Sequence, residues 1–569
     1  MSRSTTTKGL ALLVAIGLSM AACTSSSAKP ATSSAAASKT PLVIEDNPVA
    51  TFTNDFNPFD STSASSTENT NSLVYEPLFQ FNTLDATSAP IPWLATGYAW
   101  SNGNRTLTLT LRSGVKWSDG TAFTSADVAY TFGLLQSAPA TNTNGVPATT
   151  SITAPTPTSV VLNFASPESV NFEAIGTQLI VPQHLWTSVS TPATAVITGA
   201  DAIGTGPYVV NHFGAQDITY KVNPTYWGGT PKVAAVSLPA YAGNDAAELA
   251  LASGAIDLTG NDINNVQSVF VNKDPATNHL FYSSAPYFPA GNTVSLLLNN
   301  KDSNAPELGD VAVRKAISAA LDRASMASQC ETNYEAPATS AGGLTLPIDQ
   351  SALDPAVAND IQSSPQNSTV TSLLTADGYS MVGGKWTKAG KTIKFTIIDP
   401  NTFTDYWCDA QAMVTELNSV GFDVSDNGAF TYNAWNTAIT TGDYDAALHW
   451  GQGNTSFQRL QFILDPSNTA PIGQVAAEDF ERYSSPAATA AVTAYENATT
   501  SADEQSALNS LQELFANDLP AIPVLYGAAW YEYSTANFTG WPTSANPYIN
   551  PSPNSQAYEY IVLKLTPVS

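Results

Sequence analysis

Two hydrophobic periodicities occur along the chain, and together they limit the folds that it can adopt. Leu alternates with Thr in residues 105–112 (RTLTLTLR), and residues 159–164 (SVVLNF) form a second short apolar segment. Both patterns predict half-buried strands. Between them, residues 124–127 resemble a capping box that opens an apolar helix over residues 128–135. A chain that mixes strands and helices in this way indicates lobes of the α/β or mixed α+β class.

Helical patterns dominate the later part of the chain. After Asp310, apolar side chains recur at the spacing of one helix face as far as Ala324. A second helix is expected from about Ser501, ending before Leu519. No repeat of about 20 to 50 residues stands out, which excludes a solenoid. With 569 residues and roughly 100 to 200 residues per domain, two to four domains are expected.

The first residues have the pattern of an export signal. The apolar run 9–20 follows two basic residues and is too short to span a bilayer. It ends in SMAAC, residues 19–23, which resembles the lipobox of bacterial lipoproteins, where the Cys thiol is lipidated. We therefore expect a lipoprotein signal peptide with Cys23 lipidated, followed by a flexible Ser/Ala-rich tether, residues 24–40. The alternative is an ordinary secretory signal with an incidental Cys.

The charge of the chain argues against several partners. Lys and Arg number 21 and Asp and Glu 47, so the formal net charge is −26. Binding to nucleic acid relies on paired Lys and Arg and is therefore not expected, and a basic membrane-surface helix is disfavoured for the same reason. Only 12% of residues are charged, against roughly 25% on average, which suits an exported protein. Membrane attachment is expected through the lipid alone.

Little in the sequence points to a metal, a cofactor or catalysis. The four His residues are scattered and no Cys-x-x-Cys occurs, so neither a metal site nor a cofactor is expected. No Gly-x-Ser-x-Gly elbow, His-Glu-x-x-His or Walker loop is present, so we do not expect an enzyme, although a hidden triad or carboxylate pair stays open. Cys330 and Cys408 are candidates for a disulfide worth roughly 4 kcal/mol. The sequence leaves the bridged and free states open.

One long motif and a series of shorter ones run in order through the chain. The long motif is LRSGVKWSDGT, residues 111–121. The shorter ones are YEPLF (75–79), PWLA (92–95), VPQH (181–184), GTGPY (204–208), NPTYWGG (223–229), SGAID (253–257), VRKAI (313–317) and LPAIP (519–523). Together they resemble the bacterial extracellular solute-binding proteins of family 5, the receptors of ABC importers for dipeptides, oligopeptides, nickel and oligosaccharides. Most of the motifs supply turns and strand ends, so they are not taken as ligand contacts.

The resemblance implies a mixed α/β clamp of two lobes, the type II, cluster C periplasmic-binding-protein fold, with an extra subdomain and a ligand enclosed by hinge closure. By motif position, the first lobe combines residues 41–70, 196–290 and 516–569. The extra subdomain is 71–195, and the second lobe is 291–515. The implied partners are an ABC permease and its ATPase complex, and the implied location is the extracytoplasmic face of the cell membrane. We expect a monomer.

The ligand class is argued from one segment of the second lobe. In peptide-binding relatives an Asp shortly before a Thr-Ser-Phe-like segment pairs with the free amino group of the peptide. The corresponding residues 448–457 read LHWGQGNTSF and have Trp450 at that position, so this charge-assisted contact is missing. Trp offers a flat apolar face to a sugar ring, and Gln452 and Asn454 can donate and accept hydrogen bonds as hydroxyls do. We therefore expect a small polar oligomer, with an oligosaccharide favoured over a peptide.

Further ligand contacts are expected from aromatic and polar neighbours. Tyr406, Trp407 and Trp435 offer more aromatic surface, and Asn57 offers an amide from the first lobe. The segment FNPF, residues 56–59, looks like the cello-oligosaccharide and xylo-oligosaccharide branch of the family.

Each of these assignments has an alternative. The three Trp residues could belong to the core of the lobe, and Asn57 could be a turn residue. Asp405 and Asp409 could pair with an amine from another direction, so an oligopeptide is the alternative ligand. A surface-displayed enzyme or adhesin is the remote alternative function.

Overall fold

The computed structural model describes residues 40–568 apart from 47–48, 86–87, 452 and 556. The expected signal peptide, Cys23 and all but the last residue of the expected tether lie outside the described residues. Within the described part, no helix is both long and apolar enough to cross a membrane.

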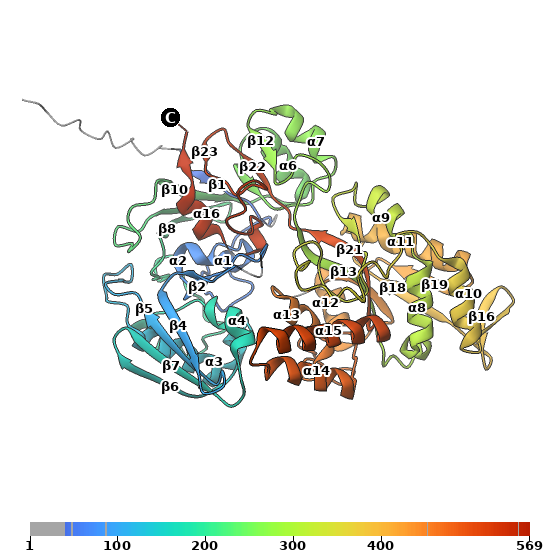
Figure 1. The fold of residues 1–569 in the computed structure, drawn as a ribbon. Helices are drawn as coiled ribbons and strands as arrows, with labels where there is room; N and C mark the ends of the chain where they lie inside the picture. The colour runs from blue at the N-terminus through green and yellow to red at the C-terminus, as the bar shows by residue number, and fades with distance from the viewer. Residues whose placement is uncertain (1–39, 47–48, 86–87, 452, 556, 569) are drawn as a thin grey trace, which may run out of the picture. The chain divides into compact units, whose positions relative to one another are not determined.

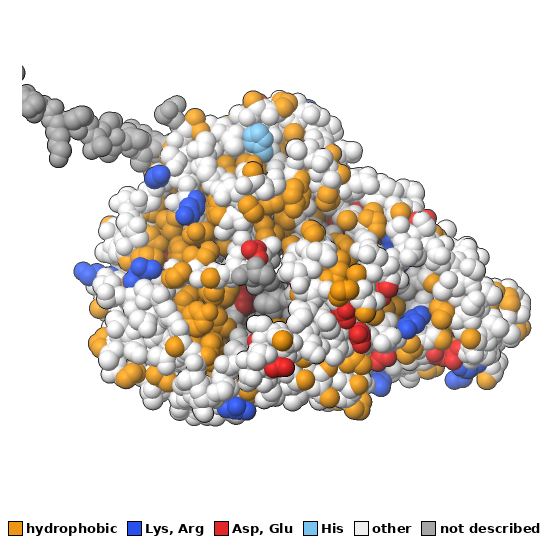
Figure 2. Space-filling view, viewed as in Figure 1, with side chains coloured by type: hydrophobic (Ala, Val, Ile, Leu, Met, Phe, Trp, Pro, Cys, Tyr) orange, Lys and Arg blue, Asp and Glu red, His pale blue; other side chains and the backbone are white. Residues whose placement is uncertain are grey.

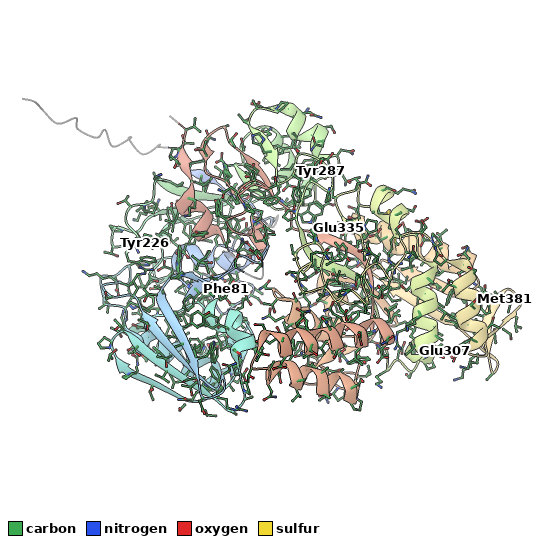
Figure 3. All side chains as sticks on the ribbon, in the orientation of Figure 1. Phe81, Tyr226, Tyr287, Glu307, Glu335 and Met381 are labelled. Atoms are coloured by element: carbon green, nitrogen blue, oxygen red, sulfur yellow. A yellow bond between two sulfur atoms is a disulfide. The ribbon has the colours of Figure 1, made fainter. Side chains whose placement is uncertain are left out.

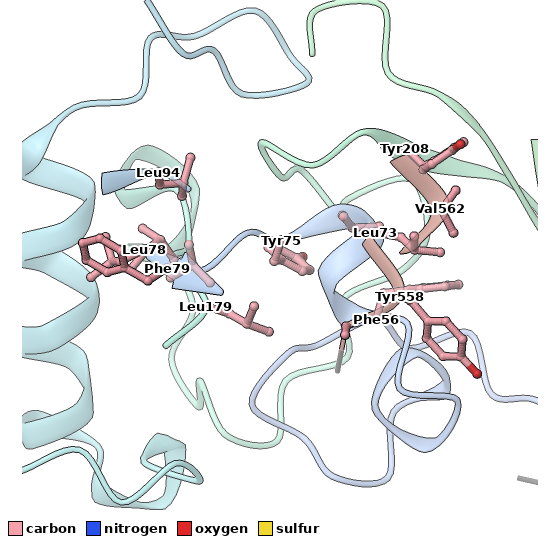
Figure 4. Close-up of a cluster of buried hydrophobic side chains, with 14 of the residues drawn as sticks. Phe56, Leu73, Tyr75, Leu78, Phe79, Leu94, Leu179, Tyr208, Tyr558 and Val562 are labelled. Carbon is pink, nitrogen blue, oxygen red and sulfur yellow. The ribbon is translucent and has the colours of Figure 1, made fainter. Parts of the chain in front are cut away.

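Two four-stranded sheets share one hydrophobic core, which we call the first lobe (Figure 1). The core draws on residues 42–281 and 531–565. Figure 4 shows part of it, where Phe56, Tyr75, Tyr208 and Tyr558 meet from distant parts of the sequence. The sheet with order β1-β10-β9-β8 contains Leu42–Val43, Ala235–Pro239, Asp217–Val222 and Tyr208–Phe213. The sheet with order β4-β5-β7-β6 contains Ala95–Ser101, Thr106–Leu111, Ser159–Phe164 and Thr149–Thr156.

Local sequence signals in this lobe form the predicted elements. Strand β5 buries its Leu side chains at 107, 109 and 111 and turns its Thr side chains outward, as the alternation predicts. Helix α3, Ser125–Ser137, covers the predicted helix and begins with the predicted capping box. The Thr124 hydroxyl accepts a hydrogen bond from the Ala126 amide, and the Asp127 carboxylate accepts one from the Thr124 amide at 2.8 Å. Both strands and the helix are therefore confirmed.

A six-stranded mixed sheet organises the second lobe. Alternate side chains of β13 enter two different cores, because successive residues of a strand point to opposite faces. Helices α8, α9, α10 and α11 pack in one core, and α12, α13, α14 and α15 in the other. The strands, in the order β14-β21-β13-β20-β18-β19, are Ala336–Pro337, Ala521–Ala528, Ala290–Leu298, Ala446–Trp450, Lys394–Ile398 and Asp423–Asn427. The helices α8 to α15 are Val311–Ala320, Arg323–Gln329, Asn367–Ala376, Thr404–Ser419, Tyr432–Thr441, Ser456–Leu464, Pro486–Glu496 and Ser501–Asp518.

Shorter elements complete the fold. The sheet β11-β22-β12 contains Leu258–Thr259, Glu532–Ser534 and Asn278–Leu280, and the sheet β15-β16-β17 contains Ser380–Val382, Lys385–Lys388 and Lys391–Thr392. The two-stranded pairs are β2-β3, Phe79–Gln80 with Ile91–Pro92, and β23-β24, Phe538–Thr539 with Thr566–Pro567. The remaining helices are α1 Ala64–Thr67, α2 Asn71–Val74, α4 Phe172–Gly176, α5 Gln183–Trp186, α6 Asn244–Ala252, α7 Val266–Val269 and α16 Tyr558–Lys564.

Two expected boundaries differ from the structure. Residues 516–528 were expected in the first lobe, but β21 pairs with β13 in the second-lobe sheet, so the chain returns to the first lobe only after Ala528. The helix expected to run from Asp310 as far as Ala324 ends at Ala320. The Asp322 side chain accepts a hydrogen bond from the Ser325 amide at 3.0 Å and caps a new helix, α9. A capping Asp therefore interrupts an apolar pattern that otherwise continues.

The structure joins Cys330 and Cys408 in a disulfide, with the two Cα atoms 5.5 Å apart. Cys330 directly follows α9, and Cys408 lies in the second turn of α11. The bond therefore fastens the end of one helix to the beginning of another.

Gly204, in the GTGPY motif, marks a close crossing of two backbone segments. A Cβ at this position would lie 1.7 Å from the carbonyl oxygen of Val74. The Gly206 amide donates to that same oxygen at 2.9 Å, and the Ser118 amide donates to the Gly204 carbonyl at 2.8 Å. The first glycine of the motif is therefore required by contact between α2 and the segment that enters β8.

We expect Gly204→Ala to destabilise the protein by about 3 kcal/mol, because backbone has to move to admit the methyl group. Gly133→Ala is the matched control, since Gly133 lies in α3 and its Cβ would meet no atom within 4 Å. The control should stabilise by about 0.5–1 kcal/mol through helix propensity. Urea unfolding of both variants measures the difference, and equal stability of the two would contradict the close crossing.

Candidate ligand-binding cleft

Two connected cavities lie between segments of the first and second lobes. Their volumes are about 660 and 690 Å³, and both are lined by Thr83, Gly453, Asn454 and Ser555. The first cavity is also lined by Phe403, Trp450 and Arg459 from the second lobe and by Asn550 and Ser552 from the first. Volumes of a few hundred to about 1,000 Å³ are typical of pockets for small ligands. We call the two cavities together the cleft.

Trp450 provides an aromatic face in the cleft. It is the last residue of β20 and is half-buried. Its ring centroid lies 4.7 Å from that of His449, 5.6 Å from that of Trp435 and 6.2 Å from that of Phe403. The Tyr406 ring is nearly parallel to it, at 6.5 Å and 28°. Packed aromatic neighbours hold Trp450 in one orientation while part of its surface stays open to the cleft.

Asn454 joins the two sides of the cleft in this conformation. Its amide donates to Glu173 Oε1 at 3.0 Å, and the Gln458 amide approaches Glu173 Oε2 at 3.4 Å. Glu173 lies on α4, in the expected extra subdomain, and burial raises the pKa of its carboxyl. Asn454 precedes Thr455, which caps α13 in a capping box with Gln458. Asn454, which was predicted to contact the ligand, is therefore hydrogen-bonded to the first lobe in this conformation.

Arg459, which lines the second-lobe side of the cleft, belongs to a buried ion pair. Arg459 Nε lies 2.9 Å from Asp349 Oδ2, and both side chains are almost fully buried. Asp349 also accepts hydrogen bonds from the Ser456 hydroxyl at 2.8 Å and the Thr345 amide at 2.9 Å. The sequence analysis missed this pair because 110 residues separate its members and no local motif links them. The Arg459 charge is thereby balanced within the protein.

Two residues predicted as ligand contacts are buried and do not line the cleft. Trp435 lies on α12, is 0% exposed and points into the core, where its ring stacks on His449 at 5.4 Å. Asn57 is also 0% exposed. Its side-chain amide and oxygen both make hydrogen bonds within the protein. Its amide donates to the carbonyls of Pro192 and Ala195 at 2.8 Å each, and its Oδ1 accepts from the Phe59 amide at 2.9 Å. Both residues therefore stabilise the fold, as their alternatives proposed.

The other predicted contacts have different outcomes. Gln452 lies outside the described residues. Tyr406 and Trp407 are half-buried on α11 and pack against the second-lobe core, and neither lines the two cavities. Asp405 and Asp409 lie on the same helix, the first half-buried and the second fully buried. Trp450 and Asn454 are thus the predicted residues that the structure brings into the cleft.

The surface charges and the possible metal ligands of the described region can be compared with the expectations from the sequence. Figure 2 shows few Lys and Arg side chains on this face and acidic side chains near its centre. No group of three or more His, Cys, Asp or Glu side chains among the described residues is arranged to hold a metal ion.

Comparison with known proteins identifies the family. The profile of the bacterial extracellular solute-binding proteins, family 5, matches residues 89–469. The chain belongs to this family. The resemblance seen in the sequence is therefore confirmed. Family 5 proteins bind solutes and are extracellular, which agrees with the extracytoplasmic location expected from the sequence.

Individual family 5 relatives are distant. Protein XP55 of Streptomyces lividans is 27% identical over 337 residues, 58% of this chain and 57% of the relative. A Brucella ovis protein named as an ABC transporter peptide-binding protein is 30% identical over 202 residues, 34% of this chain and 37% of the relative. The chain thus aligns with about half or less of the length of these relatives.

Solved structures confirm the family 5 fold. The periplasmic oligopeptide-binding protein of Thermotoga maritima has a TM-score of 0.83 at 23% identity, covering 93% of this chain and 99% of that chain. The same protein bound to mannohexaose has a TM-score of 0.77 with the same identity and coverage. The predicted mixed α/β clamp is therefore confirmed.

His449 makes a testable contribution to stability beside the cleft. Burial lowers the pKa of its imidazole to about 4, against about 6.5 in an unfolded chain. As the pH falls below 6.5, the His449 imidazole binds a proton in the unfolded chain but not in the folded one. The free energy of unfolding therefore decreases between pH 6.5 and 4. This loss should reach about 3 kcal/mol at pH 4.

We expect His449→Phe, which keeps an aromatic ring, to flatten the pH dependence of the melting temperature between pH 7 and 4.5. The exposed His212 gives the control, since His212→Gln should leave that dependence unchanged. Identical pH profiles of His449→Phe and the wild type would show that His449 is not a buried neutral base.

Proposed function

We propose that this family 5 protein is the lipid-anchored receptor of an ABC importer, which captures a small polar oligomer in the cleft and delivers it to the membrane permease. An oligosaccharide is the favoured ligand. The observation that carries this proposal is the half-buried face of Trp450, held by packed aromatic rings at the end of β20 and open to a cavity of about 660 Å³. The protein itself performs no reaction in this proposal.

The chemistry of the cleft supports a ligand rich in hydroxyls. An indole face packs against the C–H groups of a sugar ring, and side chains that both donate and accept suit hydroxyls. Thr83 and Asn550, whose side chains bond each other at 2.8 Å, and Ser552 present such groups from the first lobe. Closure around the ligand would remove water from these surfaces, and the closed form would be what the permease recognises.

An oligopeptide is the second candidate. Asp405 and Asp409 place carboxyl groups on α11, the helix that also carries Tyr406 next to Trp450. A carboxylate is the usual partner of a peptide ammonium group.

The ligand class is tested by thermal unfolding and calorimetry against cello-oligosaccharides, xylo-oligosaccharides and di- to pentapeptides. A saccharide should bind, and Trp450→Ala should weaken that binding at least about tenfold, or about 1.4 kcal/mol. Trp100→Ala is the control, because Trp100 is half-buried on β4 and does not line the cleft. Binding of peptides alone, with no effect of Trp450→Ala, would contradict the stacking proposal.

The lipid anchor is tested separately, because Cys23 lies outside the described residues. Metabolic labelling with a radioactive fatty acid should mark the full-length protein and leave Cys23→Ser unlabelled. Release of the unmodified wild-type chain into the medium would contradict the anchor and favour an ordinary secretory signal.

A further inference from the structure

Two buried carboxyl groups meet in the first lobe, next to a residue that lines the cleft. Glu76 precedes β2 and Glu559 lies on α16, and both are 0% exposed. The indole Nε1 of Trp93 lies 2.9 Å from Oε1 of each carboxyl group, so the two oxygens can be no farther apart than twice that distance. A hydrogen bond joins the two carboxyl groups. We call Glu76 and Glu559 the carboxyl pair.

Residues from three of the sequence motifs meet at the carboxyl pair. Glu76 belongs to YEPLF, Trp93 to PWLA and Trp227 to NPTYWGG. Trp227 Nε1 donates to Oε1 and Oε2 of Glu76 at 3.0 and 2.8 Å. Glu76 and Trp93 come from the expected extra subdomain, whereas Trp227 and Glu559 come from the remainder of the first lobe. The carboxyl pair therefore ties these two parts of the lobe together.

The surroundings of the carboxyl pair do not suit two negative charges. Among the described residues, three N–H groups, from Trp93, Trp227 and Gln80, donate to the four oxygens, and no ion pair involves either carboxyl group. The guanidinium of Arg112 is held elsewhere, with its carbon 4.0 Å from the centroid of the Trp227 ring and its Nε donating to the Trp93 carbonyl at 2.9 Å. Two neighbouring buried carboxylates without a cation repel each other strongly, and a hydrogen bond between carboxyl groups requires a proton on one of them.

Gln80 connects the carboxyl pair to the cleft. It lies on β2, is 6% exposed and lines the cavity of about 690 Å³. Its Nε2 donates to Glu559 Oε2 at 3.1 Å. Because an amide group is planar, this bond directs Nε2 toward the carboxyl pair and leaves Oε1 as the acceptor on the other side. In Figure 3, Phe81, which follows Gln80, lies nearer the second lobe than Tyr226, which precedes Trp227.

We propose that Glu559 holds a proton at neutral pH and donates it to the Glu76 carboxylate, and that this pair orients Gln80 to accept a hydrogen bond from the solute. Glu76 is the charged member because both indole N–H groups donate to it. Gln80 is thus a ligand contact, and the carboxyl pair positions it. This inference rests on the proposed function and adds an acceptor that selects solutes with a hydroxyl or N–H group opposite Gln80.

Proton uptake on folding is an expected property of the carboxyl pair. Burial, followed by the charge of Glu76, raises the pKa of Glu559 well above its usual range. In the unfolded chain a Glu carboxyl releases its proton at about pH 4.3, whereas the folded chain keeps it above that pH. The free energy of unfolding therefore decreases as the pH rises from this value to the folded pKa. The other titratable or charged groups around the carboxyl pair are Tyr226, Arg112 and Tyr560.

Urea unfolding at several pH values tests the proton on Glu559. Glu559→Gln should mimic the protonated acid, because its amide can donate to Glu76 while its carbonyl accepts from Gln80, and Trp93 keeps Glu76 as its acceptor. Between pH 5 and 7, the unfolding equilibrium constant of the wild type should rise about tenfold per pH unit relative to that of Glu559→Gln. Glu513→Gln, exposed on α15, is the control and should follow the wild type.

Calorimetry tests the ligand contact, with the tightest-binding solute among cello-oligosaccharides, xylo-oligosaccharides and di- to pentapeptides. Gln80→Met, which keeps the side-chain length without its polar atoms, should weaken binding about tenfold. Glu559→Met, which removes the acceptor of the Gln80 amide, should weaken it similarly, whereas Glu559→Gln should bind as the wild type does. Gln411→Met, exposed on α11, is the control. If Gln80→Met does not fold, Gln80→Asn, with its shorter side chain, gives the same comparison.

The outcomes separate the inference from the proposed function. Identical pH dependence of stability in Glu559→Gln and the wild type would overturn the proton on Glu559. Loss of binding in Trp450→Ala but not in Gln80→Met would overturn the ligand contact and leave the receptor role intact. Binding of no solute in the panel would contradict the proposed function together with the ligand contact, and the pH profiles would then decide the carboxyl pair alone.

Discussion

The antiparallel pairing of β13 with β21 fixes the place of the cleft. The chain enters the second-lobe sheet at Ala290 and leaves it at Ala528, and these two residues are register partners. A Cβ at Gly291 would lie 3.2 Å from the Cβ of Ala529, so the two crossing segments run in close contact. The same strand β13 pairs Val294 with Trp450 on its other side. One strand therefore sets both the crossing between the lobes and the position of the aromatic face.

Stability and binding place opposite demands on the residues around this crossing. The Arg459–Asp349 ion pair is buried, with Asp349 hydrogen-bonded to Ser456 and Thr345, and Trp435 and His449 fill the space beneath Trp450. By contrast, Trp450 keeps part of its ring surface open to the cleft, where it lacks packing in the unliganded protein. The disulfide between Cys330 and Cys408 fastens the end of α9 to α11, the helix that carries Tyr406 next to Trp450. A ligand that covers this face would supply the packing that the unliganded protein lacks.

Local signals in the sequence predict local structure well, because caps and alternation act over a few residues. The capping box of α3 and the Leu/Thr alternation of β5 are examples. Contacts between residues far apart in the sequence leave no such local pattern. Asn57 bonds carbonyls about 135 residues away, and only the packing of α12 under β20 decides that Trp435 is buried and Trp450 is not. The family and fold followed from motifs, whereas the partners of each site residue required the structure.

The most direct test of the account is the identity of the solute that the protein carries when it is purified from its own cells without refolding. Mass spectrometry of the small molecules released on denaturation should find a polar oligomer, and Trp450→Ala should be depleted of it. An apolar molecule, or equal loading of the variant, would contradict the account.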